Sequence, residues 1–216
     1  MLKQWVVAVF AAVLVPCHGA IAQSKDAQST DDETAVFLVA APRLVDASYR
    51  HTVLLVTPTD NDRHIGFIIN RPTQRSLSSL FPQHEPSKKV IDPVFFGGPM
   101  SRSALFAVVK AQSSPGSGSV RIMKDLFFTM RVDVVDKVIE NSPNEARYYV
   151  GYVEWRPGEL RYEINRGLWH VMNPDVSTIF RKNTDNLWEE LIRLARSITA
   201  DAKQIPAAFD PTQSLN

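Results

Sequence analysis

The sequence has little cysteine and almost no net charge. Cys17 is the only cysteine among 216 residues, so an intrachain disulfide framework is excluded. The 24 Lys and Arg residues face 23 Asp and Glu residues, and this balance argues against a nucleic-acid-binding surface. The apolar fraction of 44% is that of an ordinary globular protein, which excludes disorder throughout. The length fits one sizeable domain.

The familiar catalytic and cofactor motifs are also missing. The sequence has no G-x-S-x-G, no G-x-x-x-x-G-K-[ST] and no H-E-x-x-H. Beyond residue 22 the histidines are scattered, at His51, His64, His84 and His170. None of them pairs with another histidine or a carboxylate at metal-ligand spacing. The sequence therefore predicts neither a resident cofactor nor a metal site.

Residues 1–22 are typical of a secretory signal. Lys3 supplies the positive charge, residues 5–15 (WVVAVFAAVLV) form the apolar segment, and residues 20–22 (AIA) offer a cleavage site. The apolar segment is shorter than the roughly 20 residues that span a bilayer. We expect cleavage after Ala22, a periplasmic or secreted protein, and no transmembrane segment after cleavage. An uncleaved anchor and a buried N-terminal helix are the alternatives.

Cleavage at that point would change the composition of the working protein. It removes Cys17 and Lys3, so the remaining chain is thiol-free and has equal numbers of basic and acidic residues. A cysteine nucleophile and a thiolate metal site are then excluded. Residues 23–34 are polar and predict a flexible lead-in, and residues 199–216 predict a loose tail. Residues 35–198 form the single expected domain.

Hydrophobic patterning predicts an α+β fold. Short apolar runs bounded by turn residues predict strands at 36–41, 52–57, 65–70, 94–96, 104–111, 148–155 and 168–172. Helical spacing predicts helices at 76–81, 132–139, 157–165 and 187–198. Residues 82–93 and 113–119 are expected to be loops. Strands joined by hairpins, with helices inserted later, favour α+β over a doubly wound sheet.

The first candidate binding segment follows the third expected strand. An apolar run ends abruptly there in the polar pair Asn70 and Arg71, which is followed by Pro72. Pro72 favours an extended conformation for Arg71. Asn70 offers two donors and one acceptor, and Arg71 offers a planar fork of five donors. Strand ends often display binding groups, so this segment is a candidate binding site.

The second candidate segment is Gly97, Gly98 and Pro99. Paired glycines leave backbone N–H groups open to a ligand or to a neighbouring strand. If the two segments adjoin, Arg71 and the glycine amides could form an anion site. The alternative is that Arg71 pairs with a local carboxylate or carbonyl and that the glycines only turn the chain.

A third set of residues could support acid–base chemistry. Glu159 and Glu163 lie four residues apart and would share a helix face, although an exposed face with nearby arginine counter-ions is the simpler account. A hydrolase acting on a small anionic substrate could use Asp46, His51 and Glu163, together with Arg71. That hypothesis requires at least two of these side chains to meet in one cleft.

Several segments, in this order, resemble the YqgE/AlgH family of bacterial proteins. The matching pieces are 37–42, Asp46 with Tyr49 and 52–53, 66–72, 96–99, 149–152 with Trp155, 158–160 with Glu163, and Trp169. The resemblance covers roughly residues 36–195. It implies a single compact α+β domain with a curved, mixed, partly barrel-like sheet flanked by helices.

The resemblance implies no established reaction or cofactor. Some members of the family are labelled transcriptional regulators. This sequence departs from the family in its apparent export signal, in Ala47 after Asp46, and in Glu159 and Arg161 within 158–161. The export signal matters most, because an exported protein does not regulate transcription directly.

Three functions are compatible with these features. The leading hypothesis is a non-enzymatic module of the periplasm or cell envelope that binds a small anionic ligand or a protein partner through the Asn70–Arg71 and Gly97–Pro99 segments. The second is the hydrolase, and the third is a transcriptional regulator.

Overall fold

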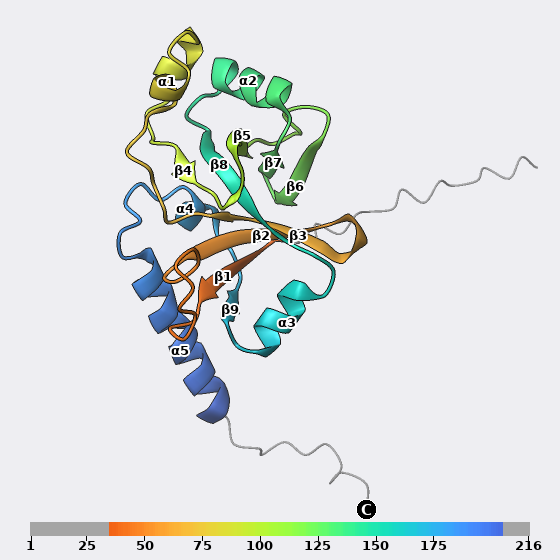
Figure 1. Ribbon diagram of the computed structural model, residues 1–216, viewed down its shortest axis with the longest axis vertical. Coiled ribbons are helices and arrows are strands. Elements are labelled where there is room, and N and C mark those ends of the chain that lie inside the picture. Colours follow the sequence, from red (N-terminus) through yellow and green to blue (C-terminus); the bar gives the residue numbers. More distant parts are fainter. Residues whose placement is uncertain (1–34, 205–216) are drawn as a thin grey trace, which may run out of the picture. The chain divides into compact units, whose positions relative to one another are not determined.

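The computed structural model describes residues 35–204, with side chains described to residue 198. The expected signal, the lead-in and residues 205–216 lie outside the described residues. The described part forms a sheet in the order β6-β7-β5-β8-β3-β2-β1-β9, with β4 beside β8 (Figure 1). The strands are β1 (Val36–Ala40), β2 (Val53–Thr59), β3 (Arg63–Ile68), β4 (Phe95–Phe96), β5 (Met100–Lys110), β6 (Ser119–Met123), β7 (Leu126–Thr129), β8 (Ala146–Trp155) and β9 (Trp169–Met172).

Helices lie on the flanks of this sheet. They are α1 (Leu77–Leu80), α2 (Val132–Asn141), α3 (Glu159–Asn165), α4 (Val176–Ile179) and α5 (Leu187–Gln204), with short 3₁₀ turns η1 (Asp60–Asp62) and η2 (Glu85–Lys89). Helix α2 packs on β5, whereas α5 packs on β1 and β9. Neighbouring strands along the path are antiparallel, and β4 pairs with β8 in parallel. The expected α+β fold with a curved, mixed, partly barrel-like sheet is confirmed.

The β2–β3 hairpin places the end of β3 next to the start of β2. Its register runs from Leu54 opposite Ile68 to Thr59 opposite Arg63, and the turn is η1. The strand ends at Ile68, slightly earlier than its apolar run suggests. Asn70 therefore lies just beyond the strand, where its side chain is free to bond outside the ladder.

Some elements differ from the sequence prediction. The β6–β7 hairpin was not predicted from the sequence, and its tight connection places Asp125 at φ 57°. Strand β5 starts at Met100, ahead of the apolar run at 104–111. The sequence prediction missed this part because its first four residues are exposed and mostly polar. Within 82–93 the chain forms η2. Helix α5 continues to Gln204, past residue 198 where the apolar periodicity ends.

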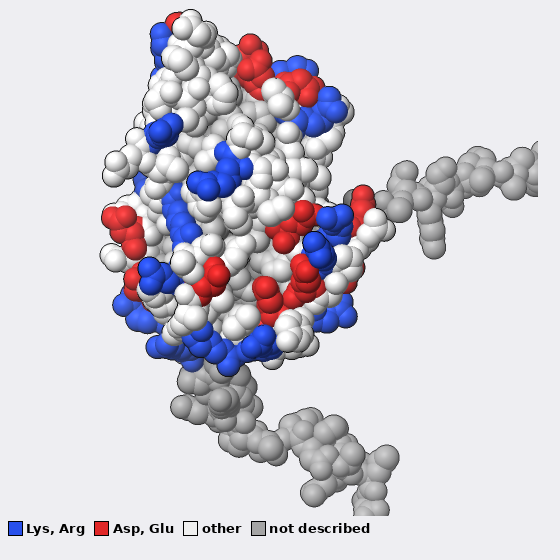
Figure 2. All heavy atoms as spheres, in the orientation of Figure 1, with Lys and Arg blue, Asp and Glu red and all other residues white. Residues whose placement is uncertain are grey.

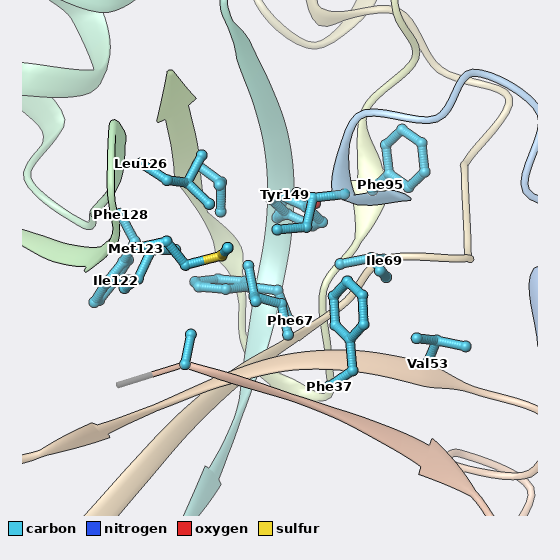
Figure 3. Packing of buried hydrophobic residues seen from close by; sticks show 14 of the residues in the cluster. Phe37, Val53, Phe67, Ile69, Phe95, Ile122, Met123, Leu126, Phe128 and Tyr149 are labelled. Carbon is cyan, nitrogen blue, oxygen red and sulfur yellow. The ribbon is translucent and has the colours of Figure 1, made fainter. Parts of the chain in front are cut away.

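The largest hydrophobic cluster is centred on the concave side of the sheet around Phe67 (Figure 3). The Phe67 ring centroid lies 5.1 Å from that of Tyr149, 5.6 Å from that of Phe128 and 5.9 Å from that of Phe106. These four rings come from β3, β8, β7 and β5, so the cluster joins strands that are distant in sequence. Tilted aromatic pairs at these separations add stability beyond simple burial.

A buried cation links this core to the segment before α5. The Arg147 side chain is fully buried, and its Nη1 and Nη2 donate to the Ile179 carbonyl at 2.6 Å and the Arg181 carbonyl at 2.9 Å. Its guanidinium carbon lies 4.2 Å from the Phe95 ring centroid, and Nη2 lies 3.6 Å from an Asp92 oxygen. Carbonyls, a ring face and a carboxylate together replace the water that the charge loses on burial.

Candidate functional site

One part of the predicted binding surface, Asn70 with Arg71, lies at a polar pocket of about 500 Å³, whereas Gly97, Gly98 and Pro99 do not line it. The turn before β2, the end of β3 and the start of α5 contribute its walls. The lining residues are Ala47, Arg50, His51, Asn70, Arg71, Asp185, Trp188 and Glu189. The pocket thus brings together Asn70 and Arg71 with His51, which the sequence assigned to the competing hydrolase hypothesis. We call it the Arg50–Arg71 pocket.

Asn70 shapes the back of this pocket through its amide. Its Oδ1 accepts from the Val53 N–H at 2.9 Å, and its Nδ2 donates to the His51 carbonyl at 2.9 Å. The side chain therefore continues the β2–β3 ladder beyond the last strand residue. These two bonds hold the turn before β2 in place, so the role of Asn70 is to position its neighbours.

Arg71 is half-buried and spans the same turn. Its Nη1 donates to the Ser48 carbonyl at 2.6 Å, and its Nη2 donates to the Arg50 carbonyl at 3.2 Å. Burial lowers the pKa of Arg71, and the neighbouring Arg50 cation lowers it further, while Asp46 and Tyr49 oppose the shift. The two bonds use two of the five guanidinium N–H donors, so the cation retains donors beyond its anchoring bonds.

The glycine segment does lie beside Arg71, through backbone contacts. The Phe96 N–H donates to the Arg71 carbonyl at 2.9 Å, and Pro72 forms an isolated antiparallel β-bridge with Phe95. The Gly97 N–H, however, donates to the Val150 carbonyl at 2.9 Å. That amide is therefore engaged in the sheet and is not open to a ligand.

Gly97 and Gly98 are required by close packing against β8. A Cβ atom on Gly97 would lie 2.3 Å from the Gly151 carbonyl oxygen, and one on Gly98 would lie 2.3 Å from the Tyr152 backbone. No side chain fits at these separations. Pro99 follows at an exposed position and does not line the Arg50–Arg71 pocket.

His51 and Trp188 form the aromatic part of the pocket. Their ring centroids lie 4.3 Å apart with 42° between the planes. Trp188 also donates from Nε1 to the Ala40 carbonyl at 2.7 Å. His51 has φ 57°, a left-handed conformation that is uncommon for a residue with a Cβ. Sequence reasoning missed Trp188, because its signal was only an aromatic residue in the first turn of an amphipathic helix.

The remaining acid–base candidates lie elsewhere. Glu163 lines a smaller pocket of about 110 Å³ together with Tyr49 and Trp155. Its Oε2 accepts from the indoles of Trp155 at 2.9 Å and Trp169 at 2.8 Å, so the carboxylate joins two tryptophans. His51 and Glu163 therefore line different pockets.

Asp46 and Glu159 both engage the backbone near them. The Asp46 Oδ1 accepts from the Ser48 N–H at 2.8 Å, which stabilises the turn before β2. Glu159 Oε2 accepts from the Arg156 N–H at 2.8 Å, at the start of α3. Burial raises the pKa of the Tyr49 phenol, and the negative charges of Asp46 and Glu163 raise it further.

The face of the molecule seen in Figure 2 carries charge of both signs. Figure 2 shows Lys and Arg interspersed with Asp and Glu over the visible face. The Arg50–Arg71 pocket has the same mixed character, with Asp185 and Glu189 on the α5 side. In the stretch from 35 to 204, none of the helices is long and apolar enough to cross a membrane.

Comparison with known proteins identifies the family. The family model described as AlgH-like matches residues 37–199. A UPF0301 protein of Bordetella petrii is 30% identical over 176 residues, which cover 79% of this chain and 86% of that protein. A UPF0301 protein of Methylococcus capsulatus is 28% identical over 170 residues, with 76% and 92% covered.

Two solved structures share the fold. The solution structure of the AlgH protein from Pseudomonas aeruginosa matches with a TM-score of 0.62 and 20% identity, over 85% of this chain and all of that one (100%). A crystal structure of a protein from Corynebacterium diphtheriae matches with a TM-score of 0.61 and 21% identity, over 74% and 85%. The resemblance inferred from the sequence is confirmed, and the chain belongs to the AlgH-like family.

Proposed function

We propose that this protein is an exported, non-enzymatic binding module of the periplasm or cell envelope, and that the Arg50–Arg71 pocket holds a small anionic ligand or an anionic group of a protein partner. The observation that carries the proposal is the pairing of two arginines at one pocket, one of them half-buried. An anion bound between Arg50 and Arg71 offsets both the repulsion between the cations and the lost solvation of Arg71.

The pocket is built to bind without rearranging. Asn70 and Arg71 hold the turn that carries Arg50 and His51 through hydrogen bonds to its backbone. A pre-organised site loses less conformational entropy when its ligand arrives. The His51–Trp188 pair adds a flat apolar surface beside the cations, which suits a ligand with a planar or apolar part next to its negative charge.

A ligand screen tests this assignment. Inorganic phosphate, citrate and a short acidic peptide are titrated against the full chain while the melting temperature is measured. We expect a stabilising probe to lose its effect in Arg50→Ala and in Arg71→Ala, and to keep it in Arg75→Ala, which removes an exposed arginine outside the pocket. A probe whose stabilisation is unchanged in Arg71→Ala contradicts the assignment.

Arg50→Ala keeps the screen interpretable if Arg71→Ala is too unstable to study. Arg50 is exposed, and the bond it contributes to the turn comes from its backbone carbonyl, which alanine retains. A lack of stabilisation by every anionic probe at millimolar concentration would contradict the anionic class of ligand.

Cell fractionation tests export. We expect a chain beginning at Gln23 in the periplasmic or secreted fraction. Val9→Arg places a charge in the apolar part of the expected signal and should leave the full-length chain unprocessed. Recovery of the unaltered full-length chain from the cytoplasm alone would contradict export and would favour the regulator hypothesis.

The hydrolase hypothesis needs at least two of its candidate side chains in one cleft, and His51 and Arg71 share the Arg50–Arg71 pocket, whereas Glu163 lines a separate one. A general base must reach the proton it abstracts directly or through one water. It stays a prediction from the sequence.

A further inference from the structure

A cluster of potential metal ligands lies near β5, away from the Arg50–Arg71 pocket, where α2 faces the segment between α1 and η2. It consists of His84, Asp136 and Glu140, whose ligand atoms all lie within 4.8 Å of one another. In Figure 1 this region lies at the end of the domain that carries α1 and α2, and α2 contacts η2. None of these residues belongs to the Arg50–Arg71 pocket.

The backbone holds the three residues in fixed relative positions. Asp136 and Glu140 lie one turn apart on α2, on the side opposite Val135 and Val138, which are buried against the sheet. His84 is held by its N–H, which donates to the Phe81 carbonyl at 3.0 Å. Its own carbonyl accepts from the Ser87 N–H at 3.1 Å, so the histidine is the N-cap of η2.

The donor set suits a divalent transition metal. Imidazole nitrogen and carboxylate oxygen are both ligands of Zn²⁺, with bonds of about 2.0–2.2 Å, so that neighbouring ligand atoms in a tetrahedral site lie about 3.3 Å apart. His84 Nε2 already lies 3.1 Å from Asp136 Oδ1. The Glu140 carboxylate is exposed and can approach by a change of rotamer. An imidazole ligand favours Zn²⁺ over Mg²⁺, which prefers oxygen ligands and retains its waters.

A ligand-sized cavity adjoins the cluster. His84 and Asp136 also line an apolar pocket of about 410 Å³ between α2, β5 and the end of α1. Its other walls are mainly apolar, from Phe81, Ala104, Leu105, Met130, Val132, Val135 and Ile139. Cavities of this size and character, with a few polar groups at one end, are typical of small-molecule sites. Three protein ligands leave at least one coordination position for a bound molecule or water.

We propose that His84, Asp136 and Glu140 bind a divalent transition metal ion, with Zn²⁺ as the preferred probe, at the mouth of this apolar pocket. The ion lies between the imidazole and the two carboxylates and neutralises both carboxylates. The alternative is a surface ion pair between His84 and Asp136, which needs no metal. The two accounts differ in whether added Zn²⁺ binds in a way that requires all three side chains.

Calorimetric titration of the untagged full chain with Zn²⁺ tests the proposal. We expect His84→Asn to remove one bound Zn²⁺ per chain or to weaken its affinity more than tenfold, because losing even an outer-shell partner of a metal site costs about 10–100-fold. Glu140→Gln should weaken binding in the same way. His170→Asn, which alters a histidine outside the cluster, should bind like the unaltered chain.

The number of Zn²⁺ ions bound per chain distinguishes this site from any other. A second Zn²⁺ site elsewhere in the chain would still be occupied in the His84 and Glu140 variants. Zn²⁺ should also raise the melting temperature of the unaltered chain and leave that of His84→Asn unchanged. All three cluster positions are on the surface side of their elements, so the variants should fold. Unchanged Zn²⁺ binding in both His84→Asn and Glu140→Gln overturns the proposal. An absence of Zn²⁺ binding by the unaltered chain, or equal competition by Mg²⁺, overturns it as well.

Discussion

The imidazole of His51 packs on the indole of Trp188, with 4.3 Å between their ring centroids. This contact ties the turn before β2 to the first turn of α5. Because Trp188 also donates to the Ala40 carbonyl at the end of β1, a single side chain connects a strand, a turn and a helix. One wall of the Arg50–Arg71 pocket depends on it.

Trp188→Phe separates the two roles of this side chain. The phenyl ring can still pack on His51, but the Ala40 carbonyl loses its donor. We expect a loss of about 1 kcal/mol in the free energy of unfolding, measured in urea, with the pocket retained. Trp188→Ala should cost about 3 kcal/mol or more, because it removes the ring as well. Equal losses in the two variants would contradict a separate contribution from the ring.

Asn70 should be more important for stability than an ordinary loop asparagine. Asn70→Ala leaves the Val53 N–H and the His51 carbonyl without their partner, and we expect a loss of about 2 kcal/mol in the free energy of unfolding. Asn141→Ala is the control, because Asn141 is exposed at the end of α2 and bonds only to the nearby Lys137 carbonyl. Its unfolding free energy should change by less than about 0.5 kcal/mol.

The close contact between Gly97 and β8 predicts a severe effect of adding one methyl group. In Gly97→Ala the new Cβ would meet the Gly151 carbonyl oxygen, so the segment must move away from β8 or lose its bond to Val150. We expect a loss of several kcal/mol, seen as a strongly lowered melting temperature.

Gly158→Ala provides the matched comparison. Gly158 has φ 80° and nothing within 4 Å of an added Cβ, so only backbone strain of about 1 kcal/mol is expected. If the two variants melt at the same temperature, close approach to β8 is not what requires glycine at position 97.

Alkaline pH should destabilise the protein through Tyr149. Burial raises the pKa of its phenol far above 10, and the nearby Arg147 only partly offsets this. The unfolded chain loses this proton near pH 10, whereas the folded chain keeps it. The stabilisation is therefore complete below about pH 10 and is lost as pH rises above that value, at about 1.4 kcal/mol per pH unit for one group.

Tyr149→Phe removes this titration. The variant should lose less stability than the unaltered chain when urea unfolding is compared at pH 9 and pH 11. Tyr162→Phe serves as the control, since Tyr162 is 62% exposed and should leave the pH dependence unchanged. The prediction fails if Tyr149→Phe and the unaltered chain show the same dependence on pH.

The sequence predicts the sheet well where apolar runs are long and bounded by turn residues. The strands around 36–41, 52–57 and 148–155 are present with small shifts of their ends. The β6–β7 hairpin was missed because its connection, Lys124 and Asp125, lacks the glycine or asparagine that usually marks a tight turn. Tertiary pairing forces Asp125 into the left-handed conformation there.

The candidate site was predictable only in part. The strand end at Asn70 and Arg71 follows from local chemistry, whereas its closeness to Gly97 was only a condition of the anion-site hypothesis and is set by sheet pairing. The hydrogen-bond partners of Asn70 and Arg71 could not be predicted in this way. They lie in the turn before β2, and only the register of the β2–β3 hairpin brings that turn next to the end of β3. His84 meets Asp136 for a similar reason, since the contact forms between segments that no sequence spacing connects.

Arg147 has a consequence for how the protein can open. If the segment from Ile179 to Arg181 detached from β8, the Arg147 cation would lose both of its carbonyl acceptors and would keep only the more distant Asp92 carboxylate and the aromatic rings. Partial unfolding of that segment is therefore costly, and α5 should separate from the sheet only when the whole domain unfolds. A ligand should accordingly enter the Arg50–Arg71 pocket while the wall formed by α5 stays in place.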